Sequence, residues 1–373
     1  MDDTNSEYAL IPHWPQIMRR YESWWKREGL VLWLTTPRQP TGGSSVNGAV
    51  TPETRVTRPR DLVGQWTDPA WRVMRAEREF ASTWYGGEAH ARFDPQLGPG
   101  NLASFLGSEP RYDTDTVWFD PCISDPERHP SLSFDPTGRH FCAQMALVEA
   151  GLVAGRGRYP VTLPDLIENV DILVSLRGME HLLEDMADRP GWIVENAALV
   201  NSIWFDVFER MRSRIVDTWG GNHWGAFCLW GKGRTAKLQC DASAAFGPPH
   251  FRRFVAPSLT AQCRGLDNSL YHLDGTQCLC HLDAVLAIDE LDAIEWTPQA
   301  GLPGGGDPRW FDIYRRILAA GKCVQAVGVE AAEVIPLLDA VGPKGMFIIA
   351  SAATEEEGLQ LEQRVDAYRS PGI

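Results

Sequence analysis

The chain has 373 residues, of which 44% are hydrophobic and 23% charged. This composition is typical of a folded globular protein, and the length suits either two average domains or one large α/β barrel with insertions. The formal net charge of −14 argues against binding to the phosphate backbone of a nucleic acid, which requires a basic surface. No apolar run approaches the roughly 20 residues that a membrane-spanning helix needs, and the acidic, polar start does not resemble a secretory signal. We therefore expect a cytoplasmic protein with neither nucleic acid nor membrane as a partner.

The eight cysteines are too sparse for a disulfide scaffold. We expect them to be reduced thiols, as in most cytosolic proteins. Cys278, Cys280 and His281 lie close together, but their spacing matches no strong zinc pattern. The sequence therefore indicates a structural role for these three residues.

In chain order, apolar and aromatic residues at helical spacing predict an amphipathic helix over residues 13–28, which precedes a continuous apolar strand at residues 30–35. Core strands are expected near residues 31, 90, 160, 238, 270, 293, 325 and 348. Further helices are expected over residues 68–85, 192–218, 248–265, 282–288, 309–320, 332–341 and 355–368. From residue 251 onwards, helices and strands alternate strictly.

About eight core strands, most of them followed by a helix, predict a (β/α)8 TIM barrel with an N-terminal helical extension and inserted loops and hairpins. The alternative is an open doubly wound sheet, but no G-x-G-x-x-G follows the first strand. No repeat or domain-sized break interrupts the pattern. We expect a single domain over residues 1–373, with the barrel proper spanning about 30–370.

A polar cluster is predicted where consecutive strands end. His272 and Asp274 stand two positions apart in a short strand and so project from one face. Glu295 lies near the end of the next strand, and Asp241 follows the preceding one. Because reactive groups in barrels gather at the C-terminal ends of strands, these four residues are the catalytic candidates.

Two chemistries suit this cluster. His272, Asp274 and Glu295 could together hold a divalent metal, zinc or another ion with nitrogen and oxygen ligands, and leave positions open for substrate. Alternatively, His272 acts as a general acid or base while Asp274 sets its tautomer and orientation. The residues alone leave both readings open.

Substrate-binding candidates are less sharply defined. Arg38 and Arg177 are basic residues near predicted strand ends. The chain also holds 15 tryptophans, which suit an aromatic pocket as well as a packed core. Trp230 and Trp296 are the aromatic candidates because each lies in or beside a predicted core strand.

Four stretches together resemble the uroporphyrinogen decarboxylase superfamily, which also contains the corrinoid-linked methyltransferases. They are Leu97–Gly107, Leu238–Ser243, Tyr271–Gly275 and Leu291–Trp296, and the spacing of the last three strands agrees. The resemblance covers most of residues 10–370 and is best from about 225 onwards. It implies a (β/α)8 barrel whose active site lies in a C-terminal cleft.

In the methyltransferase branch, a zinc motif His-x-Cys-Gly ends the fifth strand. The matching stretch here is His272-Leu273-Asp274-Gly275, where an aspartate replaces the thiolate, and Glu295 matches a glutamate one strand later. The branch's final cysteine should follow the eighth strand, where residues 350–353 contain none. The resemblance thus implies a metal held by nitrogen and oxygen, without the thiolates that tune zinc for thiol methylation.

In the decarboxylase branch, an arginine-rich segment follows the first strand and an aspartate holds the pyrrole nitrogens. Arg38 is the only basic match, and Asp241 does not align with that aspartate, so uroporphyrinogen is not the expected substrate. The favoured expectation is methyl or one-carbon transfer on a small organic molecule, with a corrinoid carrier protein as partner. The alternatives are a decarboxylase or other lyase, and a binding barrel without catalysis. Assembly as a homodimer also remains open.

Overall fold

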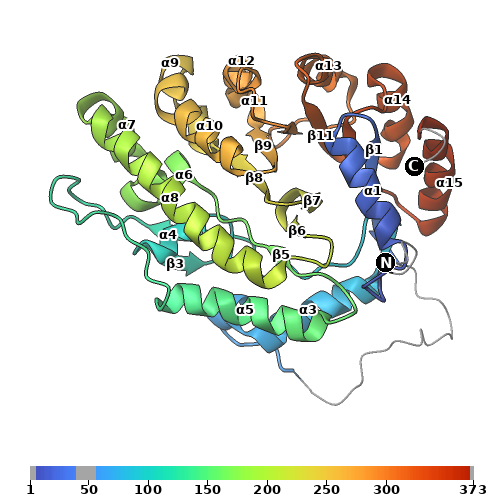
Figure 1. Ribbon diagram of the computed structural model, residues 1–373, viewed down its shortest axis with the longest axis horizontal. Coiled ribbons are helices and arrows are strands. Elements are labelled where there is room, and N and C mark those ends of the chain that lie inside the picture. The colour runs from blue at the N-terminus through green and yellow to red at the C-terminus, as the bar shows by residue number, and fades with distance from the viewer. Residues whose placement is uncertain (1–5, 39–55, 370–373) are drawn as a thin grey trace.

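A computed structural model of the chain describes residues 6–38 and 56–369. A seven-stranded sheet lies at its centre, with helices around the outside (Figure 1). In spatial order its strands are β2 (Thr83–Gly87), β1 (Leu30–Pro37), β12 (Met346–Ser351), β11 (Cys323–Glu330), β10 (Ala293–Thr297), β9 (Asn268–Asp274) and β8 (Thr235–Gln239). All neighbouring pairs are parallel except β1 and β2.

The parallel strands are nearly continuous apolar runs because helices and the molecular interior cover both of their faces. In β1, the first five residues, Leu30 to Leu34, are all buried, as are the first four residues of β10. The predicted strands near residues 31, 238, 270, 293, 325 and 348 are therefore confirmed.

A second sheet has three strands, β5 (Thr162–Leu163), β6 (Gly221–Trp224) and β7 (Leu229–Lys232), and a hairpin pairs β3 (Glu109–Tyr112) with β4 (Val117–Asp120). The strand expected near residue 90 is reduced to one bridge between Phe93 and Val161. Pro95 and Pro160 flank this bridge, and proline has no N–H with which to extend a ladder. The α/β class is confirmed, whereas the ladders of the described residues form separate sheets and not one closed ring.

Fifteen α-helices occur in the described part of the chain. They are α1 (Trp14–Trp25), α2 (Leu62–Thr67), α3 (Pro69–Ser82), α4 (Leu102–Phe105), α5 (Arg139–Gly155), α6 (Asn169–Arg177), α7 (Met179–Asp188), α8 (Pro190–Ile215), α9 (Pro248–His250), α10 (Ala256–Gly265), α11 (Gly275–Cys278), α12 (Leu282–Leu286), α13 (Phe311–Ala319), α14 (Ala331–Val341) and α15 (Glu355–Val365). Short 3-10 turns are η1 (Ala226–Cys228), η2 (Asp241–Ala245), η4 (Leu279–His281), η5 (Pro308–Trp310) and η6 (Asp366–Tyr368).

The helix expected over residues 248–265 is interrupted. Between α9 and α10 lies a π-helical turn, η3 (Phe251–Val255). The second residue of α10 is Pro257, which cannot donate a hydrogen bond to the preceding turn and so breaks the regular α ladder.

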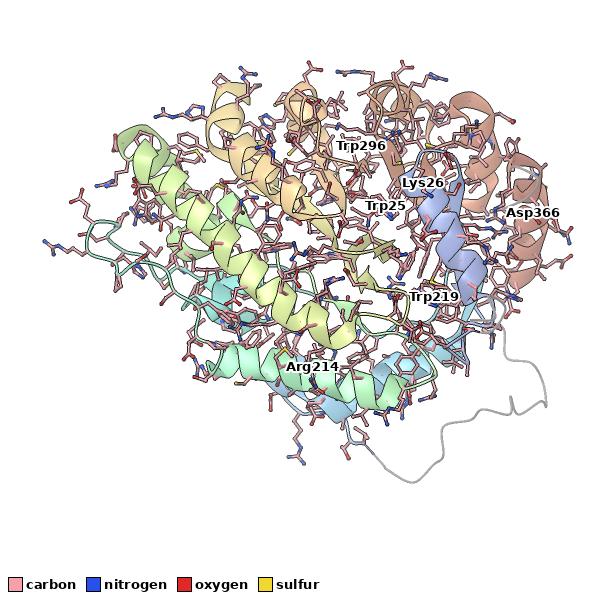
Figure 2. The ribbon with its side chains drawn as sticks, viewed as in Figure 1. Trp25, Lys26, Arg214, Trp219, Trp296 and Asp366 are labelled. Atoms are coloured by element: carbon pink, nitrogen blue, oxygen red, sulfur yellow. The ribbon has the colours of Figure 1, made fainter. Side chains whose placement is uncertain are left out.

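Helix α1 packs against β1 and β7 along its apolar face. Trp14, Tyr21 and Trp24 are fully buried, and the Trp24 indole donates to the Gly345 carbonyl oxygen over 3.0 Å. Figure 2 shows the neighbouring Trp25, whose indole donates to the Trp230 carbonyl oxygen over 2.9 Å. The predicted amphipathic helix is thus confirmed, and it seals one side of the core.

All eight cysteines are free, as the sequence predicted. Within residues 6–38 and 56–369, none of the helices combines the length and the hydrophobicity that crossing a bilayer requires.

Candidate active site

Strand register places four buried polar side chains in one row across the large sheet. Gln239 pairs with His272, His272 with Glu295, and Glu295 with Gln325. Residues in register on neighbouring parallel strands project from the same face. Four polar groups side by side in a largely apolar sheet indicate a functional centre, because burying them is costly unless they are paired or used.

Glu295 binds one side of the His272 ring. Its Oε2 is hydrogen-bonded to His272 Nδ1, and its Oε1 accepts from the Thr297 hydroxyl over 2.6 Å. A carboxylate can only accept a hydrogen bond, so Nδ1 carries the proton and donates it. This leaves Nε2 as the ring nitrogen available for chemistry.

Nε2 faces two further carboxylates. It lies 3.9 Å from Asp241 Oδ1, and ligand atoms of Asp241, His272 and Asp274 all lie within 4.8 Å of one another. Ligands at about 2.1 Å from a shared ion stand up to ~4.2 Å apart, so small side-chain rotations would complete such a site. The donor set fits a divalent ion held by one nitrogen and two oxygens.

The structure therefore brings the four catalytic candidates together. The predicted metal ligands were His272, Asp274 and Glu295, but the positions of Glu295 and Asp241 differ from that prediction. Glu295 lies on the Nδ1 side of the imidazole, where it can orient the ring but not share an ion with Nε2. Asp241 takes the place that the sequence assigned to Glu295. Among metal sites, a histidine oriented by a carboxylate on its second nitrogen is a common arrangement.

The electrostatics of His272 follow from these neighbours. Burial lowers the pKa of His272, but the charge and the hydrogen bond of Glu295 outweigh it, with a further contribution from Asp241, so that the pKa is raised above its usual value. Without a metal, the ring is therefore biased toward the imidazolium form, with Nε2–H directed at the acids.

Asp241 is held by α6 and by the polar row. The Asp171 carboxylate accepts hydrogen bonds from the backbone N–H groups of Asp241 and Ala242, each over 2.9 Å, and Gln239 Nε2 donates to Asp241 Oδ2 over 2.7 Å. Desolvation, together with the Asp171 charge, raises the pKa of Asp241 to about 7, while the charge of His272 opposes this change. A carboxyl group with such a pKa can exchange protons near neutral pH.

A buried ion pair lies next to this row. The Lys237 ammonium lies 2.7 Å from Asp165 Oδ1 and donates to Gln239 Oε1. Glu168, also fully buried, accepts from the Gln239 backbone N–H. These contacts fix the Gln239 amide, so its Nε2 is directed at Asp241.

Phe227 covers the His272 ring, with ring centroids 4.7 Å apart. It belongs to η1, in which Phe227 and Cys228 both have φ of 58°, a left-handed conformation that costs energy for residues with a side chain. Gln325 Nε2 donates to the Phe227 carbonyl oxygen over 2.8 Å, and the Tyr21 hydroxyl donates to the Cys228 carbonyl oxygen over 2.6 Å. Contacts from two elements thus hold this strained turn over the imidazole.

The arginine candidates lie elsewhere. Arg177 is buried in an ion pair with Asp185, 2.8 Å apart, and also donates to the carbonyl oxygens of Ile123 and Ser124. Arg38 lies at the end of β1, 4.0 Å from Glu355. Neither makes a contact with the His272 cluster in the described part of the chain.

The tryptophan candidates are part of the core. The Trp230 indole donates to Asp217 over 2.7 Å and packs edge-on against Trp14. Trp296 (labelled in Figure 2) is adjacent to Glu295 and therefore projects from the opposite face of β10. There it packs against Trp310, with ring centroids 5.2 Å apart. Both side chains are almost completely buried.

Sequence reasoning missed Phe227, Asp171 and Gln239. Gln239 is the last residue of β8 and stands two residues before Asp241, a spacing that was visible in the sequence. Asp171 precedes Asp241 by 70 residues and Phe227 lies 45 residues before His272, so no local spacing connects them with the cluster. Only the packing of α6 and η1 brings them there.

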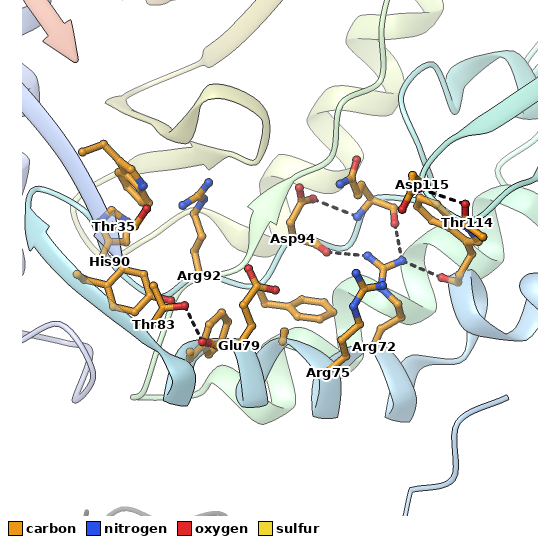
Figure 3. A pocket seen from close by; sticks show the side chains of 17 residues that line it. Thr35, Arg72, Arg75, Glu79, Thr83, His90, Arg92, Asp94, Thr114 and Asp115 are labelled. Atoms are coloured by element: carbon orange, nitrogen blue, oxygen red, sulfur yellow. Dashed lines mark hydrogen bonds between the residues drawn. The ribbon is translucent and has the colours of Figure 1, made fainter. Parts of the chain in front are cut away.

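A cavity lies between α3 and the region where β1 ends. It has a volume of about 540 Å³ and is lined by three arginines, several aromatic rings and the turn between β3 and β4 (Figure 3). Its arginines are Arg72, Arg75 and Arg92. The His272 cluster does not line it, but the turn containing Phe227 and Cys228 connects the two, because Arg92 Nη2 donates to Cys228 Sγ over 3.0 Å.

No protein-family model matches the chain, and no curated protein matches its sequence. Among solved structures, the chain is similar to a methyltransferase from Methanosarcina mazei. The alignment covers 94% of this chain and 98% of that chain, with a TM-score of 0.59 and 10% sequence identity. At this identity the likeness shows a shared fold.

Proposed function

We propose that this protein is an enzyme that transfers a methyl or other one-carbon group from or to a small organic molecule, with a divalent metal bound by His272, Asp241 and Asp274. The observation that carries the proposal is the placement of His272 between Glu295 on Nδ1 and two carboxylates near Nε2. The fold shared with a methyltransferase supports the reaction class.

In this proposal the chain's own residues have separate tasks. Glu295 keeps the proton on Nδ1, so the Nε2 lone pair is free for the ion. Phe227 shields one face of the ring from water. A divalent ion held there would supply Lewis-acid activation of an oxygen or nitrogen group of the substrate.

The proposed methyl carrier is a corrinoid protein, on the strength of the motif resemblance and the fold. A red chromophore that co-purifies with the tagged protein and transfers methyl groups in its presence would support this partner. Transfer that proceeds equally well without any corrinoid would contradict it.

The metal is tested by elemental analysis of protein purified without chelators. We expect about one divalent ion per chain in the wild type, little in His272→Ala, and an unchanged amount in the control His181→Ala, whose side chain is exposed. A wild type without stoichiometric metal, even after incubation with zinc, manganese or cobalt salts, would overturn the metal-dependent function.

A second function is favoured by the raised pKa of His272. As an imidazolium, His272 could donate its Nε2 proton to a carbanion left by loss of carbon dioxide, which makes a decarboxylase on a non-porphyrin substrate the alternative. This alternative expects turnover that survives removal of metal and is abolished in His272→Ala.

A further inference from the structure

The cavity of Figure 3 contains a cation whose charge the described residues leave without an ion-pair partner. Arg92 stacks over Trp33, with its guanidinium carbon 4.3 Å from the ring centroid. Its Nη2 donates to the Gly225 carbonyl oxygen over 3.2 Å and to Cys228 Sγ. Within residues 6–38 and 56–369, this guanidinium takes part in no ion pair shorter than 4.0 Å, and no group accepts from its buried Nε, although the charge of Asp94 contributes to raising the Arg92 pKa. Such a cation is a ready partner for an anion.

The neighbouring His90 contributes an unused acceptor. Its Nδ1 lies 2.8 Å from the Glu88 carbonyl oxygen, so Nδ1 must be the protonated nitrogen and Nε2 carries the lone pair. His90 is only 3% exposed, and Nε2 has no hydrogen-bond partner among the described residues. A group that binds beside Arg92 can therefore satisfy His90 by donating a hydrogen bond.

The rest of the wall suits an organic body. Phe80, Tyr85 and Trp66 line the cavity together with Arg92. A volume of about 540 Å³ is in the range of pockets that enclose small organic ligands. Three acids also line the wall, Glu79, Asp94 and Asp115. The charges of Arg72 and Arg92 both act on Asp94, Asp115 lies at the β3–β4 turn, and Glu79 lies on α3 (Figure 3).

We propose that this cavity binds a small organic carboxylate that also carries a hydrogen-bond donor, with the carboxylate on Arg92 and the donor on His90. The inference deepens the proposed function, on which it rests for the view that the bound acid is the substrate. One turn of chain separates the two sites: Cys228 contacts Arg92, and Phe227 contacts His272. A ligand anchored on Arg92 would thus be held one turn of chain away from the catalytic cluster.

Three probes of similar shape test the ligand class by calorimetry or ligand-observed NMR. Mandelate has the carboxylate and the donor, phenylacetate lacks the hydroxyl donor, and mandelamide lacks the charge. We expect mandelate to bind most tightly and mandelamide at least about 10-fold more weakly, as loss of a charge-assisted hydrogen bond predicts. Equal binding of acid and amide, or no binding of any probe at 10 mM, would overturn the proposal.

Variants locate the site. Arg92→Gln should weaken both acids about 10-fold or more and leave mandelamide unchanged. The control Arg316→Gln removes an exposed arginine that pairs with Asp283 and should change nothing. If Arg92→Gln misfolds, wild-type protein answers the same question: mandelate should protect Arg92 from modification by phenylglyoxal, as read by mass spectrometry. Unprotected Arg92 at saturating mandelate would overturn the assignment.

Failure of this proposal is distinguishable from failure of the proposed function. Probe binding should persist in His272→Ala and in chelator-treated protein, because Arg92 and His90 contact neither His272 nor the metal candidates. Conversely, metal content should be unchanged in Arg92→Gln.

Discussion

At the scale of the residue, His272 is defined by what binds each of its two nitrogens. Glu295 occupies Nδ1, and Asp241 and Asp274 face Nε2. The same imidazole can therefore serve as a metal ligand or as an acid, and the proton on Nε2 competes directly with a metal. Which of the two it holds depends on Glu295 and Asp241, whose effects are open to test one at a time.

Glu295→Gln should lower the pKa of His272. Burial, which lowers it, remains, whereas the charge that raises it is lost. In metal-free protein, the His272 ring should have a lower pKa in the variant than in the wild type. NMR titration of the histidine ring signals measures this difference. Metal affinity should fall about 10- to 100-fold, as is typical when the partner of a ligating histidine is removed.

The matched control for that change is Glu290→Gln, which removes a partly exposed carboxylate paired with Arg264 and should leave the His272 titration unchanged. An unaltered His272 titration in Glu295→Gln itself would mean that the carboxylate does not govern the ring.

Asp241 should make stability depend on pH in a defined window. Its pKa rises from 3.8 to about 7 on folding, so the folded chain binds this proton more tightly than the unfolded chain. Its contribution to stability therefore declines as pH rises from about 4 to about 7 and stays low above that. The amide introduced by Asp241→Asn cannot ionise. In metal-free protein, the urea concentration at the unfolding midpoint should therefore fall less in this variant than in the wild type as pH rises from about 4 to about 7. Parallel pH profiles for the two proteins would contradict the raised pKa.

At the scale of the element, α6 and η2 are joined by one carboxylate. Asp171 lies in the first turn of α6 and accepts from two backbone N–H groups at the start of η2. This contact, not the local sequence, sets where Asp241 stands relative to His272. The loop after β8 is thus part of the site because a helix on a different segment holds it.

Asp171→Ala should cost about 2 kcal/mol of unfolding free energy, because two backbone donors lose a charged acceptor. It should also lower the pKa of Asp241, since the Asp171 charge is one of the causes that raise it. Urea denaturation measures the first effect. The control Asp206→Ala removes an exposed acid paired with Arg210 on α8 and should cost less than ~0.5 kcal/mol. Equal losses in the two variants would show that Asp171 has no special role.

At the scale of the whole molecule, Glu88 connects segments from both ends of the chain. This fully buried carboxylate pairs with Arg20 of α1 and with Arg369 near the C-terminus, and it accepts from the Leu32 backbone N–H of β1 over 2.7 Å. Three segments far apart in the sequence therefore meet at one side chain.

Glu88→Ala should destabilise the protein by about 3–5 kcal/mol, since it leaves two largely buried guanidinium groups without their counter-charge. Chemical denaturation followed by circular dichroism measures the change. Glu88→Gln keeps the shape and one acceptor and should lose less. A loss below ~1 kcal/mol for Glu88→Ala would show that the ion-pair network is dispensable.

Much of the architecture was predictable from local pattern. Continuous apolar runs identified the parallel strands, and helical spacing identified α1, because burial on one or two faces leaves a periodic mark in the sequence. The spacing of His272 and Asp274 likewise predicted a shared face, since strand periodicity is local. The alternation of helices and strands predicted that Glu295 lies on a neighbouring parallel strand. The strand expected near residue 90 forms only a single bridge, between Phe93 and Val161, because prolines close to both residues limit further pairing.

The sequence by itself determined the α/β class, the position of α1 and the gathering of His272, Asp274, Glu295 and Asp241. Tertiary structure alone decided which acid faces which nitrogen of His272, the cover provided by Phe227, and the place of Arg92 in the cavity. The reason is physical: periodicity specifies which face a side chain occupies, whereas distances between segments depend on how the elements pack. Roles that rest on a few ångströms, such as orienting a ring or holding an ion, are settled only at that level.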